Sequence, residues 1–164
     1  MSQFLEWTPD LSVGIDVIDG QHKRIVDYVN QLHEARIRRD RGAIAGIIEE
    51  LVDYTLSHFS FEEVMMEQAN YRFLKAHQKI HALFIRRVES YQQRFKSGED
   101  VETVATDMQA TLVAWLMNHI RREDMDYAEP IRAALGEGLR KPVAEEVGSG
   151  WLVATLQRIF GSRR

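Results

Sequence analysis

Apolar residues recur along most of the chain at the three- and four-residue spacing of an amphipathic helix. The clearest run places its apolar side chains on one helical face: Ile44, Ile47, Ile48, Leu51, Val52 and Leu56. We find no segment with the strict apolar and polar alternation of a half-buried strand. The pattern therefore predicts an all-α protein.

Breaks in this pattern divide the chain into helices. Proline, the strongest helix breaker, occurs only at Pro9, Pro130 and Pro142, so the long interval between the first two can be helical. Weaker breaks fall near residues 40, 70 and 98, where Gly98 suits the position after a helix end and Asp100 suits an N-cap. These breaks predict helices over residues 19–38, 41–68, 72–96 and 100–133. Because short connections make consecutive helices antiparallel, we expect an up-down-up-down four-helix bundle.

The last part of the chain differs from the predicted bundle. We divide the chain into a bundle, residues 1–135, and an extension, residues 136–164, in which a glycine-containing linker leads to the segment WLVATLQRIFGSRR at 151–164. That segment predicts a short amphipathic helix with a basic end and this apolar stripe: Leu152, Leu156, Ile159 and Phe160. It could pack on the bundle, dock on a partner protein or lie on an anionic membrane surface. Its modest apolar area and few arginines favour the first two.

Composition narrows the chemistry. The chain has 164 residues, 45% of them hydrophobic, which suits one domain with a single core. It has no cysteine, so any metal that it holds must rest on histidine and carboxylate ligands. A net charge of -4 argues against a nucleic-acid binder. Without a basic, apolar leader or a membrane-length apolar run, we expect a cytoplasmic monomer with no transmembrane segment.

Five of the six histidines fall at one level of the predicted bundle. They lie 17 to 21 residues from the loops near residues 40 and 98, on all four helices: His22, His58, His77, His81 and His119. At a rise of about 1.5 Å per residue, antiparallel helices bring them within roughly 6 Å of one level. An isolated histidine pair is usually a solvated face, but agreement among four helices favours a metal site.

The direction in which these side chains face supports the same interpretation. His58 and Glu62 are four residues apart, as are His77 and His81, so each pair can point at one spot. His33 lies about three turns, roughly 16 Å, from His22 and is expected to be a packing or surface histidine.

On the fourth helix, periodicity favours Glu123, four residues after His119, over Asp124, which is rotated by about 140°. A bridging ligand can approach from the side, so the offset is tolerable and spacing alone leaves both residues open.

Four segments resemble those of the hemerythrin family, and in particular its bacterial single-domain members. They appear in order, each on its expected helix: WTPDLSVGIDVIDGQHK at 7–23, HFSFE at 58–62, HQKIH at 77–81 and WLMNHIRREDMDY at 115–127. The resemblance covers the bundle and implies a non-haem di-iron centre with an oxo or hydroxo bridge, which binds dioxygen reversibly.

Carried over residue by residue, the resemblance implies the following ligands. One iron takes His77, His81 and His119, the other takes His22 and His58, and Glu62 and Asp124 bridge the two. Here the family pattern, not the spacing, selects Asp124. With the solvent-derived bridge, the first iron has six ligands and the second has five, which leaves an open position for dioxygen on the iron of His22 and His58.

Around the centre we expect an apolar wall that limits access of water and protons to the bound oxygen: Phe59, Trp115, Leu116 and Ile120. Tyr127 could either orient contacts around Asp124 or cap the core.

The expected function is oxygen storage or delivery to oxygen-requiring enzymes, with the segment 151–164 as a contact for such a partner. The alternative is oxygen or redox sensing, or iron or peroxide handling, through a partner protein. We do not expect an enzyme, because carboxylate-rich oxygenase sites use Glu-x-x-His pairs and no glutamate lies three residues before a histidine here.

Overall fold

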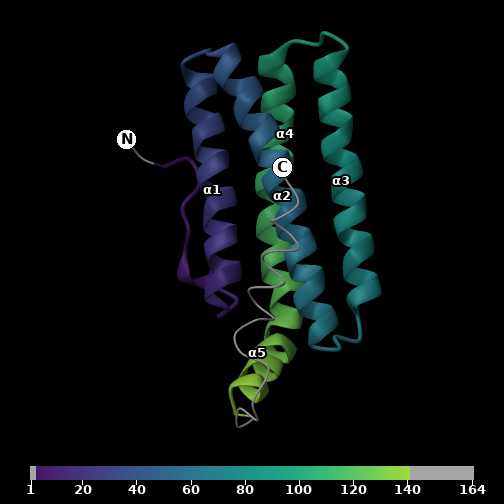
Figure 1. The fold of residues 1–164 in the computed structure, drawn as a ribbon. Coiled ribbons are helices and arrows are strands. Elements are labelled where there is room, and N and C mark those ends of the chain that lie inside the picture. The colour runs from purple at the N-terminus through teal and green to yellow at the C-terminus, as the bar shows by residue number, and fades with distance from the viewer. Residues whose placement is uncertain (1–2, 141–164) are drawn as a thin grey trace, which may run out of the picture.

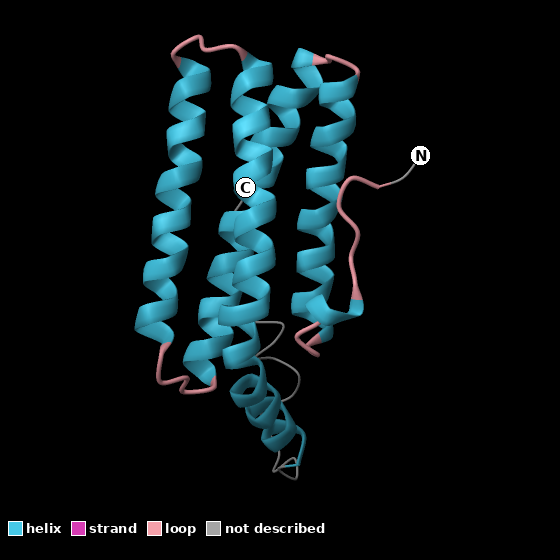
Figure 2. Cartoon of the chain, turned by 180° about the vertical axis from the view of Figure 1, so that it is seen from behind, coloured by secondary structure: helices cyan, strands magenta, loops and turns pink. Residues whose placement is uncertain are grey.

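The computed structural model describes residues 3–140, and these residues form helices joined by short loops, with no strand among them (Figure 2). Four long helices make up the body of the molecule: α1 (Asp16–Ile37), α2 (Arg41–Gln68), α3 (Leu74–Lys96) and α4 (Val101–His119). A short 3-10 turn, η1 (Pro9–Leu11), precedes them. A π-helical turn, η2 (Ile120–Asp124), and a last helix, α5 (Met125–Arg140), follow. In the part described, no helix is both long enough and apolar enough to span a membrane.

The four long helices pack as an antiparallel bundle, which confirms the predicted fold. α1 and α3 each pack against both α2 and α4, and consecutive helices run in opposite directions (Figure 1). α5 continues the direction of α4 and extends past the end of the other helices (Figure 1).

The helix ends follow the expected chemistry. Gly98 has a positive φ of 86°, which suits the residue after α3, and the side chain of Asp100 accepts a hydrogen bond from the backbone N–H of Thr103 at the start of α4. α1 begins three residues earlier than predicted. The side chain of Asp19 accepts hydrogen bonds from the Ser12 hydroxyl (2.6 Å) and the Val13 N–H (2.8 Å), which tie the preceding loop to the first turn of α1.

The fourth predicted helix differs most from expectation. It is interrupted by η2 and then runs to Arg140, so the first residues assigned to the linker, 136–140, are helical. The remainder of the extension, including the predicted amphipathic segment 151–164, lies outside the described residues.

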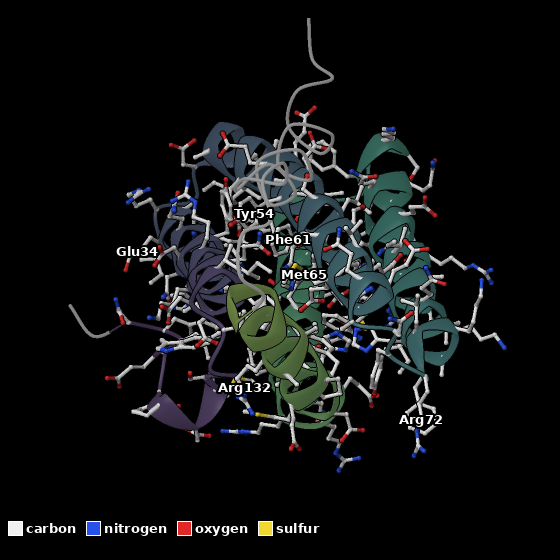
Figure 3. All side chains as sticks on the ribbon, turned by 60° about the horizontal axis from the view of Figure 1, so that its bottom comes forward. Glu34, Tyr54, Phe61, Met65, Arg72 and Arg132 are labelled. Carbon is white, nitrogen blue, oxygen red and sulfur yellow. The ribbon has the colours of Figure 1, made fainter. Side chains whose placement is uncertain are left out.

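Large apolar side chains fill the space between the helices. Phe61 and Met65 point into the interior from α2, whereas Arg72 points away from the bundle (Figure 3). The segment before α1 lies along the bundle, where the side chain of Asn30 pairs with both the N–H and the C=O of Leu5. The Arg132 guanidinium donates to the Val13 carbonyl oxygen (2.6 Å), so α5 is joined to the same segment.

Candidate metal centre

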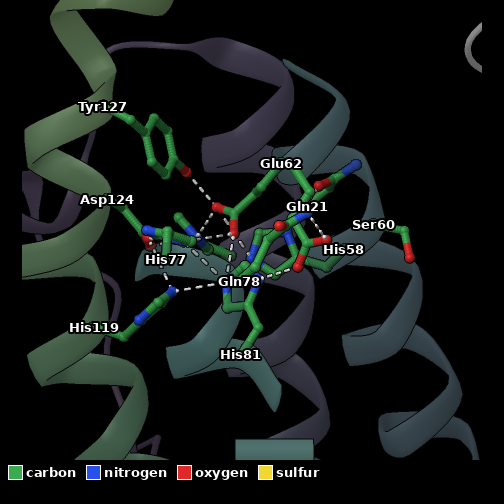
Figure 4. Close-up of polar contacts among 12 residues, drawn as sticks. Gln21, His58, Ser60, Glu62, His77, Gln78, His81, His119, Asp124 and Tyr127 are labelled. Carbon is green, nitrogen blue, oxygen red and sulfur yellow. Dashed lines mark hydrogen bonds and ion pairs between the residues drawn. The ribbon is translucent and has the colours of Figure 1, made fainter. Parts of the chain in front are cut away.

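All four helices of the bundle direct polar side chains into one buried cluster (Figure 4). Each of these side chains is at most 3% exposed: His22, His58, Glu62, His77, His81, His119 and Asp124. In an apolar core, buried imidazoles and carboxylates are costly unless they are paired or hold a metal. The structure thus brings together the seven residues that the family resemblance implied.

Within this cluster three histidines form one group. The Nε2 atoms of His77 and His81 lie 3.0 Å apart, and those of His81 and His119 lie 3.1 Å apart. Adjacent ligands on a six-coordinate metal with bonds of about 2.1 Å lie about 3 Å apart. The three nitrogens are therefore spaced like adjacent ligands of a single ion.

The remaining two histidines lie on the other side of the carboxylates. Oε1 of Glu62 lies 3.5 Å from Nε2 of His58 and 3.6 Å from Nε2 of His22, while Oε2 lies 3.3 Å from Nε2 of His81. Asp124 is placed in the same way, with Oδ1 3.0 Å from Nε2 of His119 and Oδ2 3.3 Å from Nε2 of His22. Each carboxylate therefore turns one oxygen toward each histidine group, as a bridging ligand does.

The π-helical turn η2 explains how Asp124 reaches the cluster. The backbone N–H of Met125 donates to the carbonyl oxygen of Ile120, five residues back, so this turn holds one residue more than an α-helical turn. Asp124 then comes under His119 and is fully buried, whereas Glu123 is only half-buried. Spacing favoured Glu123 because it assumed an uninterrupted α-helix.

The polar atoms of this cluster fit a bound cation. Several buried atoms have no hydrogen-bond partner, among them Nε2 of His22, Oε2 of Glu62 and both carboxylate oxygens of Asp124. Imidazole nitrogens with carboxylate oxygens are a donor set that suits iron. The seven side chains therefore fit a metal centre in both geometry and chemistry.

Electrostatics prepares two of the histidines to bind a metal and opposes binding at a third. Burial lowers the pKa of both His58 and His77 to about 4, so these rings are neutral at pH 7 and carry a free lone pair. Burial opposes protonation of His22 as well, but the carboxylates of Asp124 and Glu62 outweigh it and raise the pKa of His22 to about 9. A metal ion that binds here must therefore displace a proton from His22.

Two residues of the predicted apolar wall contact histidines of the cluster. Phe59 stacks on the ring of His81 with centroids 3.8 Å apart, and Trp115 stacks on His119 at 4.1 Å. Leu116 and Ile120 are buried, as expected, whereas Trp115 is only partly buried.

His33 takes no part in the cluster. It stacks on Phe4 with centroids 4.2 Å apart and is partly buried. This placement agrees with its expected role as a packing histidine.

Sequence reasoning missed two residues that contact the second ring nitrogen of a histidine. Nδ1 of His58 lies 2.8 Å from Oε1 of Gln21, and Nδ1 of His81 lies 2.8 Å from Oε1 of Glu63. Both partners directly adjoin a ligand residue in sequence, which was the one available signal. Tyr127, left open above, donates a hydrogen bond to Oε1 of Glu62 and is fully buried.

Comparison with known families decides which kind of metal centre this is. The family model described as the hemerythrin HHE cation binding domain matches residues 13–130. The chain belongs to the hemerythrin family. The resemblance inferred from the four sequence segments is thereby confirmed.

Relatives within the hemerythrin family differ in how much of the chain they cover. A bacteriohemerythrin from Pseudomonas aeruginosa is 50% identical over 157 residues, which are 96% of this chain and 98% of that protein. A bacteriohemerythrin from Stenotrophomonas maltophilia is 46% identical over the same shares. A solved structure, described as wild-type hemerythrin, has a TM-score of 0.73 and 30% identity, and covers 78% of this chain and 98% of its own. The P. aeruginosa relative therefore matches this chain well beyond the part that the solved hemerythrin covers.

Proposed function

We propose that this protein binds dioxygen reversibly at a non-haem di-iron centre. The observation that carries the proposal is the division of Glu62 and Asp124 between two groups of histidines, in a chain of the hemerythrin family. Two carboxylates that each face two groups of imidazoles are what a pair of neighbouring metal ions requires.

In this proposal, His77, His81 and His119 hold one iron, while His22 and His58 hold the other. Glu62 and Asp124 bridge them. The second iron would then have one protein ligand fewer, which would leave a position for dioxygen. When bound, a pair of ferrous ions supplies the two electrons and the open position that reversible oxygen capture needs.

The protein residues around the centre control what reaches it. Phe59, Leu116 and Ile120 are buried and would limit the access of water and protons to the centre. Tyr127 donates a hydrogen bond to Oε1 of Glu62, the oxygen that faces His22 and His58, and so would weaken electron donation from that oxygen to an iron held by these two histidines.

The ligand set favours binding over catalysis. Five imidazoles and two carboxylates make a nitrogen-rich centre, whereas ferritin-like di-iron sites take most of their ligands from carboxylates. We assign the protein to oxygen storage or delivery, because a site of this kind holds oxygen without transforming a second substrate.

An oxygen titration of the reduced protein tests this function. Protein loaded anaerobically with ferrous iron should contain two irons per chain, take up one dioxygen per chain and gain a charge-transfer absorption band. That band should disappear when oxygen is removed under argon and return on re-exposure. A single metal per chain, or permanent oxidation at the first exposure, would refute the proposal.

A further inference from the structure

Glu63 connects the metal centre to the edge of the bundle. Its Oε1 lies 2.8 Å from Nδ1 of the buried His81, and its Oε2 accepts a hydrogen bond of 3.2 Å from Nε2 of Gln78. The Glu63 side chain is 27% exposed, whereas that of His81 is 1% exposed. The carboxylate is thus held in place from both sides and retains contact with water.

One turn of α2 holds the ring of His81 from three directions. Phe59 stacks on its face with only 7° between the ring planes, and Oε2 of Glu62 lies 3.3 Å from its Nε2. Glu63, four residues after Phe59, takes the opposite nitrogen. The stack sets the plane of the imidazole, and the Glu63 contact sets its rotation within that plane, so Nε2 is aimed at the centre.

His22, His58 and His119 lack a charged partner of this kind at Nδ1 in the described part of the chain. His58 has the neutral amide of Gln21 at its Nδ1, and the Nδ1 atoms of His22 and His119 have no hydrogen-bond partner in the described part of the chain. A carboxylate on the second nitrogen of a ligating histidine fixes the tautomer and raises the basicity of the ligand, more than an amide does.

We propose that Glu63 is a positioning residue, which fixes His81 as an Nε2 ligand and makes the three-histidine iron the more electron-rich of the two. This inference rests on the proposed di-iron function. Electron donation through His81 would stabilise the ferric state of an iron that His81 holds, so Glu63 would lower the reduction potential of the centre. Tyr127 acts on the opposite side of the centre, so the two outer contacts reinforce the inequality that the ligand count creates.

The test compares Glu63→Gln, Glu63→Ala and the control Glu67→Gln in the full-length, iron-loaded protein. Glu67 lies one turn further along α2 and is exposed, so its replacement removes the same charge from the same helix. Two readouts are measured: iron affinity by competition with a chelator, and the ferric to ferrous midpoint potential by spectroelectrochemistry.

Glu63→Gln keeps an acceptor oxygen but loses the charge, so it should mainly raise the midpoint potential. We expect the ferric to ferrous ratio at a fixed potential to fall about tenfold, which is about 59 mV for a one-electron step. Glu63→Ala also loses the contact and should weaken iron binding by about 10- to 100-fold. Glu67→Gln should change neither quantity.

An unchanged potential in Glu63→Gln, or an equal shift in Glu67→Gln, would overturn the proposal. If the Glu63 variants do not fold, the midpoint potential of Gln78→Ala tests the proposal instead, because this variant removes the hydrogen bond that Gln78 donates to Glu63. A small upward shift supports the proposal and no shift overturns it. If the wild-type protein holds two irons but oxygen oxidises them irreversibly, the proposed oxygen-binding function is wrong. The iron affinity and the midpoint potential of the Glu63 variants still test the role of Glu63.

Discussion

Each histidine of the centre presents Nε2 to the middle of the bundle, and the surroundings of the rings differ from one to the next. His58 and His77 are held neutral by burial, whereas His22 is held protonated by the two carboxylates until a metal replaces the proton. At the scale of the residue, imidazoles that share one cluster therefore differ in their protonation at pH 7.

Replacement of a single histidine distinguishes the centre from the rest of the protein. His77→Ala should lower iron affinity by about tenfold or more and reduce the iron content to less than two per chain, because it removes a ligand and leaves its neighbours mispaired. His33→Ala is the control, since His33 packs against Phe4 outside the cluster. Metal analysis of the purified variants measures both, and equal iron loss in the two variants would contradict the assignment.

At the scale of the element, the π-helical turn η2 decides the last ligand. A turn with one extra residue brings Asp124 under His119 and leaves Glu123 half-buried at the edge. π-helical turns often occur at functional sites, where they redirect one side chain without ending the helix.

This turn is also one feature of the site that could not be predicted from the sequence. Apolar periodicity and the Gly98 and Asp100 signals suffice for four helices, and the equal heights of the histidines place five side chains at one level. Asp124 required the family pattern, because no local signal reveals a π-helical turn. The Glu63 contact could not be predicted, since it depends on the rotation of α3 against α2.

Asp124→Asn and Glu123→Gln make the same chemical change at neighbouring positions and so test the turn. Asp124→Asn should lose a bridging ligand and most of the bound iron, because an amide is a much poorer bridge than a carboxylate. Glu123→Gln should retain two irons per chain. Iron analysis measures the outcome, and a thermal melt verifies that both variants fold. Iron loss in Glu123→Gln alone would mean that Glu123, which spacing favoured, is the bridging carboxylate.

At the scale of the whole molecule, we expect the iron-free protein to be most stable at about pH 6.5. The pKa of His58 and of His77 is about 4 in the folded protein, against 6.5 for a free histidine. The unfolded chain therefore binds more protons between pH 6.5 and pH 4, and stability is lost as the pH falls through this range. His22, with a pKa of about 9, stabilises the fold below about pH 6.5, and this contribution is lost as the pH rises toward 9. Thermal melts by circular dichroism across this range measure the effect. A steady rise in melting temperature up to pH 9 would contradict it.

The extension, residues 136–164, is the second feature of the whole molecule to consider. The P. aeruginosa relative aligns over 96% of the chain, whereas the solved hemerythrin covers 78% with nearly all of its own length. We therefore predict that the extension is not needed to build the bundle.

Truncation after Arg140 keeps every described helix and should retain two irons and reversible oxygen binding. Iron analysis and an oxygen titration of the truncated protein measure this. Loss of iron on truncation would mean that residues 141–164 complete the core around the centre.

The burial of the seven proposed ligands also determines when a chain can take up or lose a metal ion. They lie on every helix of the bundle and are at most 3% exposed, so an ion can enter or leave only when the helices part, an event whose frequency falls as the bundle becomes more stable. We therefore expect chains that acquire iron as they fold to keep it when the supply later declines, and chains made when iron is scarce to remain without it for longer. The oxygen capacity of a population of this protein then records the iron available at synthesis rather than at the moment of use.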